Sequence, residues 1–235
     1  MLDQDTIALF PLWYVAFLLS LTCHEAAHAL AAKWGGDPTA YYSGQVTLNP
    51  LPHVQREMFG TIAVPAITFL LNGWMLGWGS APYDPYWEQR HPRKAAWMAL
   101  AGPVANFILV IVSGLLIHAG MALEAFRPPE TLTLWVHLVG GTTPVADGFA
   151  RFLSLMFSLN LMLGCFNLLP VAPLDGHSVV GLFLPESTHL NWLAFIRQPM
   201  PSLIGLVAAW QFFGYLFMPV YVAAIKLLYW GVRFL

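Results

Sequence analysis

Residues 9–32 read LFPLWYVAFLLSLTCHEAAHALAA, a run of apolar side chains interrupted by His24, Glu25 and His28. The run is long enough for a helix that crosses a bilayer, which needs about 20 mainly apolar residues. On such a helix, residues four apart lie about 40° from each other around the axis, so both imidazoles face one side. Ionisable groups in hydrocarbon are costly and tend to mark functional sites, so this stretch indicates a membrane fold and a place for chemistry within it.

The arrangement His24-Glu25-Ala26-Ala27-His28 is a known chemical pattern. On a helix, the two histidines of a His-Glu-x-x-His motif bind zinc, and the glutamate acts on a water held at the metal. Glu25 falls beside the face that carries the two imidazoles. The motif therefore predicts two zinc ligands and one catalytic acid/base.

The composition indicates a protein of the lipid bilayer. Of its 235 residues, 58% are hydrophobic and 9% are charged, and the mean hydropathy is +0.63. A soluble domain carries roughly 25% charged residues. We therefore expect residues 1–235 to form a single all-α polytopic domain. The net charge of −2, with no run of basic residues, argues against a nucleic-acid partner.

Hydropathy predicts about four to six membrane-embedded helical segments. One of the apolar stretches contains Pro65, Asn72 and Gly73, which favour a re-entrant segment, although Pro and Gly are also tolerated in crossing helices. The stretch 41–48 is rich in Tyr, Val and Thr and is bounded by Gly and Pro, so it predicts a short membrane-associated β-strand region. The apolar stretches are about 8–32, 59–78, 96–118, 151–169 and 203–230.

A second chemical signal lies at residues 167–177, which read NLLPVAPLDGH. Pro170 and Pro173 end or kink the preceding helix, and Gly176 allows backbone geometry that other residues resist. Asp175 would then lie at the end of the helix. A catalytic zinc usually has three protein ligands and an open position, so Asp175 is the candidate third ligand. The alternative is an ordinary Asp-Gly turn after a helix.

The basic residues suggest an orientation. Five of them lie between the first span and residue 95, whereas the connection 119–150 contains only Arg127. The positive-inside tendency then places the C-terminal end of the first span in the cytoplasm, with His28 about 8 Å from that end. If all of the first four apolar stretches crossed the membrane, Asp175 would lie on the side opposite His28. For Asp175 to reach the same side, segment 59–78 must dip into the membrane and return. The five basic residues are Lys33, Arg56, Arg90, Arg93 and Lys94.

Together these residues resemble the site-2 protease family of intramembrane metalloproteases, in its compact bacterial form without a PDZ or CBS domain. Three motifs carry the resemblance: His24 through His28, Ala101-Gly102-Pro103-Val104-Ala105-Asn106, and Asn167 through Gly176. The segment from Gly44 to Pro50 also looks like the membrane-associated strand region of that family. The agreement in order and rough spacing extends over about residues 18–185.

The resemblance implies a zinc metalloendopeptidase that cuts transmembrane helices of membrane proteins near the cytoplasmic face of a bacterial inner membrane. One Zn²⁺ per chain would be held by His24, His28 and Asp175, and Glu25 would be the catalytic acid/base. The resemblance also singles out three weaker candidates for substrate binding or for support behind the ligands. They are Asn167, which would hold an unwound substrate, Asn106, which would bond between helices, and His177.

Two other classes of function use some of the same residues. A metal transporter could hold an ion transiently with the same ligands, but it does not need a carboxylate such as Glu25 beside them. A non-catalytic binder of membrane proteins would need neither the ligands nor Glu25.

Overall fold

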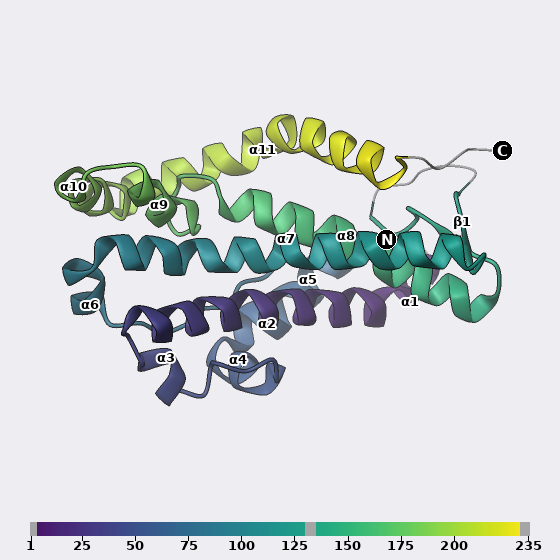
Figure 1. Cartoon of the computed structure of the whole chain (residues 1–235), viewed down its shortest axis with the longest axis horizontal. Coiled ribbons are helices and arrows are strands. Elements are labelled where there is room, and N and C mark those ends of the chain that lie inside the picture. Colours follow the sequence, from purple (N-terminus) through teal and green to yellow (C-terminus); the bar gives the residue numbers. More distant parts are fainter. Residues whose placement is uncertain (1–3, 130–134, 231–235) are drawn as a thin grey trace.

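The computed structural model describes residues 4–129 and 135–230, and this part of the chain is mainly helical. Four of its helices are long and apolar enough to cross a membrane, judged by length and composition. They run along the long axis of the molecule (Figure 1). The predicted all-α polytopic class is therefore confirmed. The four helices are α2 (Phe10–Gly35), α7 (Pro92–Ala122), α8 (Pro144–Asn167) and α11 (Pro199–Leu228).

Short elements connect these helices at the two ends of the bundle. Figure 1 shows α3, α6, α9 and α10 at one end and strand β1 near the other. Strand β1 pairs with β2 in a small antiparallel ribbon. The short elements are α1 (Gln4–Ala8), α3 (Thr39–Tyr42), α4 (Pro50–Arg56), α6 (Pro85–Arg90), β1 (Phe126–Arg127), β2 (Gly140–Gly141), α9 (Gly176–Val179), the 3₁₀ turn η2 (Val180–Leu182) and α10 (Glu186–Ile196).

Helix α7 packs along both α2 and α8, and these three helices form the centre of the bundle. Small side chains on α7 allow the close approach, because helices in a membrane associate through van der Waals packing at small residues. Buried examples are Ala95, Ala99 and Gly102. By contrast, α11 keeps most of its large apolar side chains exposed, as expected for a surface in contact with lipid.

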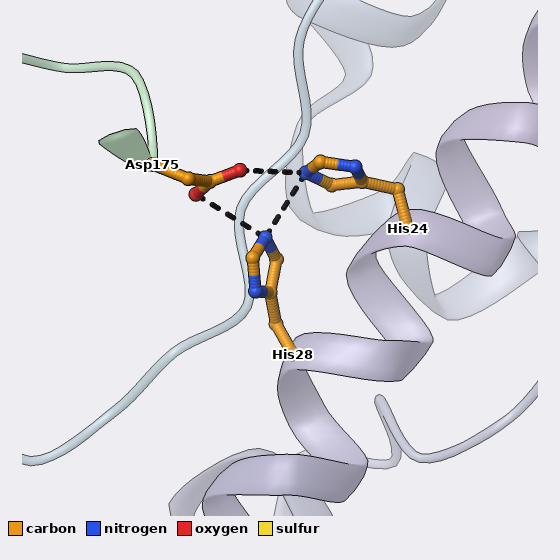
Figure 2. Close-up of side chains that lie close together, drawn as sticks. All are labelled: His24, His28 and Asp175. Atoms are coloured by element: carbon orange, nitrogen blue, oxygen red, sulfur yellow. Dashed lines mark hydrogen bonds and ion pairs between the residues drawn. The ribbon is translucent and has the colours of Figure 1, made fainter. Parts of the chain in front are cut away.

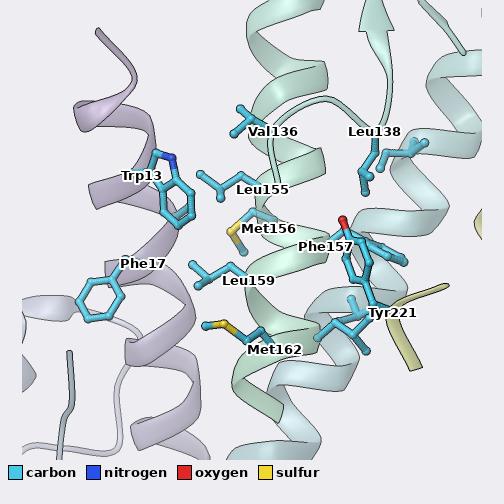
Figure 3. Close-up of a cluster of buried hydrophobic side chains, with 14 of the residues drawn as sticks. Trp13, Phe17, Val136, Leu138, Leu155, Met156, Phe157, Leu159, Met162 and Tyr221 are labelled. Carbon is cyan, nitrogen blue, oxygen red and sulfur yellow. The ribbon is translucent and has the colours of Figure 1, made fainter. Parts of the chain in front are cut away.

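The main hydrophobic cluster fills the space between the long helices. Figure 3 shows Trp13 of α2 beside Leu155 of α8, and Phe17 and Leu159 belong to the same cluster. Tyr221 of α11 joins the same cluster. This packing fixes the position of α2 relative to α8. It therefore also fixes the position of His24 and His28, which lie further along α2.

Segment 59–78 folds back on itself, which is the course that the re-entrant prediction requires. A π-helical turn η1 (Phe59–Ala63) continues into α5 (Val64–Asn72), and together they span about 21 Å, which is short of the roughly 30 Å of a hydrocarbon core. Gly73 then ends the helix with a left-handed φ of 77°. The chain runs back beside its own start, where the Trp78 amide donates to the Gly60 carbonyl at 3.2 Å.

The prediction of a β-strand region over 41–48 is wrong. The chain forms the short helix α3 there, followed by turns and bends. The carboxylate of Asp37 accepts hydrogen bonds from the amide and hydroxyl of Thr39, which stabilises the start of this helix. Gly44 then adopts a φ of 71°, so the chain turns sharply where a strand would have continued. The local turns have overridden the β-propensity of the tyrosines and Val46.

The re-entrant course of 59–78 predicts which exposed positions share one side of the membrane. In a background without the two native cysteines, Met58→Cys and Tyr86→Cys flank this segment, and Leu123→Cys follows α7; all three native side chains are exposed. We expect a membrane-impermeant maleimide to label the first two from one side only and Leu123→Cys from the other. Labelling of Met58→Cys and Tyr86→Cys from opposite sides would show that the segment crosses. The cysteine-free background is the control.

Candidate metal centre

Three side chains from distant parts of the sequence meet inside the bundle. Figure 2 shows His24 and His28 on α2 pointing toward Asp175, which precedes α9. The two Nε2 atoms lie 3.0 Å apart. His24 Nε2 lies 3.1 Å from Asp175 Oδ2, and His28 Nε2 lies 3.3 Å from Oδ1. The structure thus brings together the three residues that the sequence singled out as metal ligands, and their ligand atoms all lie within 4.8 Å of one another.

The loop after α8 brings Asp175 to this position. Gly176 lies against the Leu168 and Leu169 carbonyls so closely that a β-carbon there would overlap both of them. The glycine therefore lets the chain fold back on the end of α8. The loop presents a carboxylate.

Hydrogen bonds orient both imidazoles with Nε2 toward the centre. His28 Nδ1 lies 2.8 Å from the Met98 carbonyl, and His24 Nδ1 lies 2.6 Å from Asn106 Oδ1. Because both partners are acceptors, each histidine carries its proton on Nδ1, and the lone pair of each Nε2 faces Asp175. This is the arrangement that metal-binding histidines adopt when their other nitrogen donates to a carbonyl or an amide oxygen.

The amide orientation of Asn106 is fixed by a chain of bonds behind it. Asn160 Nδ2 donates to the Met156 carbonyl and to Ser20 Oγ, both at 2.8 Å. Its oxygen therefore faces Asn106 and accepts from Asn106 Nδ2 at 2.8 Å. Asn106 can then only present its own oxygen to His24. All the side chains in this series of hydrogen bonds are buried, and they link α8, α7 and α2.

The converging atoms fit a small cation. Two bare imidazole nitrogens and a carboxylate all present lone pairs to one point, and Asp175 Oδ2 is buried with no hydrogen-bond donor. Such an arrangement is unfavourable unless positive charge lies between the atoms. A tetrahedral zinc ion, with ligand bonds of about 2.0–2.2 Å, sets neighbouring ligand atoms about 3.3–3.6 Å apart. The separations of 3.0, 3.1 and 3.3 Å lie close to that range.

Gly102 makes room for the two imidazoles. A β-carbon at this position would overlap His28 Nε2 and would lie 2.6 Å from His24 Nε2. The backbone of α7 therefore passes directly behind the ligand atoms. An isolated glycine in a helix interior usually has a packing reason. Here that reason is the space that the two imidazoles occupy.

Glu25 lies beside the three ligand residues and is not one of the converging groups. It is buried, and the backbone of Gly79 packs against it so closely that a β-carbon at Gly79 would lie 2.8 Å from Glu25 Cγ. The extended chain that returns from the re-entrant helix thus forms one wall around Glu25. This position suits a carboxylate that handles a proton next to a metal.

Two cavities meet at Glu25 and Asp175. The larger one has a volume of about 600 Å³ and has mainly apolar walls from α2, α8, α11 and the returning segment 74–79. The smaller one, of about 200 Å³, is more polar. Among the residues around the larger cavity are Phe17, Leu21, Trp74, Met162, Trp210 and Phe213; Ser80, Glu88, His177 and Arg197 belong to the smaller one.

The weaker candidates occupy three different positions. Asn106 supports His24 through the bond to Nδ1. Asn167 lines the larger cavity, and its Nδ2 donates to the Leu163 carbonyl at 3.1 Å. His177 lies behind Asp175 and bonds the Leu174 carbonyl through Nδ1; burial and the nearby Arg197 guanidinium lower the pKa of His177. Sequence reasoning missed Asn160, although an amide in an apolar helix was a signal for bonding between helices.

The fit of α7 behind the ligands predicts that Gly102→Ala loses bound metal. The added methyl group overlaps the space of His28 Nε2, so one imidazole must rotate away from the centre. We expect metal content, measured by mass spectrometry on purified protein, to fall well below one ion per chain. Gly148→Ala is the matched control, because a β-carbon at Gly148 meets no atom within 4 Å. Full metal content in Gly102→Ala would contradict this account of the site.

The bond from His24 to Asn106 predicts a second effect. Asn106→Ala removes the acceptor that fixes the imidazole, and loss of such a partner typically weakens metal affinity about 10–100-fold. Competition with a chromogenic chelator measures this affinity. Ser20→Ala, at the far end of the same chain of bonds, should have a much smaller effect because Asn160 keeps its bond to Met156. Equal affinities in the two variants would be the contrary result.

Comparisons with known proteins agree with this geometry. The model of peptidase family M50 matches residues 12–194. YwhC of Bacillus subtilis (strain 168) is 32% identical over 184 residues, which are 76% of this chain and 72% of that protein. Rip2 of Mycolicibacterium smegmatis is 29% identical over 79% of this chain and 60% of its own length. MJ0611 of Methanocaldococcus jannaschii is 24% identical over 86% and 78%, respectively.

The names of these three relatives describe them as proposed zinc metalloproteases. No solved structure matches the chain. The matched range contains the His-Glu-x-x-His helix, the glycine behind it and Asp175, so the resemblance seen in the sequence is confirmed. This chain belongs to peptidase family M50, the family of the site-2 proteases.

Proposed function

We propose that this chain is an intramembrane zinc metalloprotease that hydrolyses peptide bonds within or near transmembrane helices of membrane-protein substrates. The observation that carries the proposal is the position of the metal centre. His24, His28 and Asp175, with Glu25 beside them, lie next to a largely apolar cavity between helices that are apolar enough to cross a membrane.

The ion in this proposal is one Zn²⁺ per chain. Two imidazoles and one carboxylate are a donor set that zinc accepts, and three protein ligands leave a fourth position open, as in catalytic zinc sites. When bound, zinc polarises a carbonyl oxygen and lowers the pKa of water toward about 7. The family and the names of its members support zinc over other divalent ions.

Glu25 is the proton carrier in this proposal. Glu25 lines both the apolar and the polar cavity, so it can meet the substrate on one side and water on the other. Glu25 accepts a proton from the water that attacks the scissile carbonyl. It then delivers that proton to the leaving amine as the peptide bond breaks.

The substrate in this proposal enters from the lipid. The apolar walls of the larger cavity match apolar side chains, but a helical peptide bond is covered by its own hydrogen bonds and must unwind before it reacts. Asn167 lines the cavity and offers a polar side chain to unwound backbone. Trp74 stacks on Trp210 with ring centroids 5.9 Å apart, so α11 and the returning segment adjoin at the cavity.

We place the metal centre toward the cytoplasmic side of a bacterial inner membrane. The end of the bundle that carries α3, α6, α9 and α10 lies at the C-terminal end of α2 (Figure 1). This end has the basic residues that favour the cytoplasm, among them Lys33, Arg90 and Lys94. The accessibility of Met58→Cys and Leu123→Cys from each side tests this orientation.

Glu25→Gln separates proton transfer from metal binding. The amide has nearly the same shape but cannot accept the proton, so we expect cleavage to fall by at least about 100-fold. Zinc content should remain at the wild-type level because Glu25 is not one of the three converging residues. The assay follows cleavage of a transmembrane-helix reporter in liposomes, and the exposed Glu186→Gln is the control. Cleavage by Glu25→Gln at the wild-type rate would refute this role.

The same preparations distinguish the other classes of function. Movement of zinc across the liposome membrane without cleavage of any helical reporter would indicate a transporter. Stable capture of the reporter without cleavage or zinc movement would indicate a binder of membrane proteins. Loss of cleavage on chelation, with recovery on addition of zinc, is the result expected for the protease.

A further inference from the structure

A partly buried ion pair joins two short helices behind Asp175. Arg197 directly follows α10, and its guanidinium bonds both carboxylate oxygens of Glu88 on α6, at 2.6 and 2.7 Å. The Glu88 side chain is only 7% exposed. A two-point contact of this kind fixes direction as well as distance. The pair therefore fixes the guanidinium at one place in the polar cavity.

The remaining donors of the same guanidinium hold the turn that contains Asp175. Arg197 Nε donates to His177 Nε2 at 2.9 Å, and a terminal nitrogen donates to Ser178 Oγ at 3.2 Å. Because arginine can only donate, His177 Nε2 must accept, and the His177 proton lies on Nδ1. That nitrogen donates to the Leu174 carbonyl at 2.6 Å. The network thus fixes Leu174, which precedes Asp175, and His177 and Ser178, which follow it.

Helix α10 adds a second contact to the same turn. Trp192 Nε1 donates to the His177 carbonyl at 2.7 Å, so α10 holds the backbone of His177 and Arg197, which follows α10, holds its side chain. Arg197, Glu88 and His177 share the cavity of about 200 Å³ with Glu25 and Asp175. In such a partly dehydrated place, hydrogen bonds to charged groups are strong and their loss is costly.

We propose that Arg197, anchored by Glu88, is a positioning residue that keeps the Asp175 carboxylate directed at His24 and His28. It acts through His177 and touches none of the three metal ligands in the contacts described. The proposal rests on the proposed zinc centre. It does not depend on which peptide bond the enzyme cuts.

The competing explanation is a purely structural ion pair that holds α6 against α10. Loss of a structural pair would lower thermal stability and leave the metal environment of the folded protein unchanged. Loss of a positioning residue would change how fast the ion leaves and how its ligands are arranged. Measurements on the bound ion therefore separate the two roles.

The test compares Arg197→Ala, Arg197→Lys and Glu88→Gln with wild type as purified full-length proteins. Chelator capture measures the zinc dissociation rate, and the visible absorption of Co²⁺-loaded protein reports ligand geometry. Removing an outer partner typically costs about 10–100-fold in metal affinity, and we expect the dissociation rate of Arg197→Ala to rise by that factor, with altered Co²⁺ bands. Arg197→Lys keeps the charge but cannot bond Glu88 and His177 together, so its rate should be intermediate.

Arg151→Ala is the matched control. It removes another arginine–carboxylate pair, Arg151 with Asp147 at 2.7 Å, whose arginine is similarly exposed. That pair lies near the start of α8, whereas Asp175 follows the end of this helix. We expect Arg151→Ala to change neither the zinc dissociation rate nor the Co²⁺ spectrum, even if its melting temperature falls.

If Arg197→Lys and Glu88→Gln both keep the wild-type zinc dissociation rate and Co²⁺ spectrum, the positioning role is overturned. This outcome is decisive even if Arg197→Ala fails to fold. Zinc loss from Arg151→Ala as fast as from Arg197→Ala would overturn it as well. Faster zinc loss in the Arg197 variants, alongside a wild type that binds zinc but cleaves no reporter, would support the positioning role while the protease proposal fails.

Discussion

The whole structure depends on the convergence of three electron-pair donors inside an apolar bundle. His24, His28 and Asp175 can lie together only if α7 approaches α2 closely and the loop after α8 folds back. Gly102 makes the first condition possible and Gly176 the second, since a β-carbon at either position would overlap its neighbours. The site and the packing are therefore one constraint, met by the same few residues.

Polar side chains within the apolar helices are explained by the same constraint. Ser20, Asn160 and Asn106 form a buried chain of hydrogen bonds that ends on His24. Each group would be costly in hydrocarbon on its own, but each has a partner on a neighbouring helix. The chain thus stabilises the contact of α2, α7 and α8 and also orients a ligand.

Much of this arrangement was predictable because it depends on local sequence. Apolar length located the long helices, and the spacing of His24 and His28 together with Asp175 indicated the three side chains that the structure brings together. The strand predicted over 41–48 failed because the bonds from Thr39 to Asp37 and the left-handed Gly44 turn the chain there, which outweighs β-propensity. The roles of Asn160 and Arg197 depend on partners far away in the sequence, and no local pattern encodes such a pairing.

The meeting of an apolar and a polar cavity at Glu25 and Asp175 has a consequence for the direction of the proposed reaction. Hydrolysis turns a neutral amide into an ammonium group and a carboxylate, and keeping such ions in an apolar space costs several kcal/mol each. The new chain ends therefore favour the polar side, whereas the intact peptide favours the apolar side. Cleavage itself would move the product away from its place of entry, which disfavours resynthesis of the bond and clears the site for the next substrate.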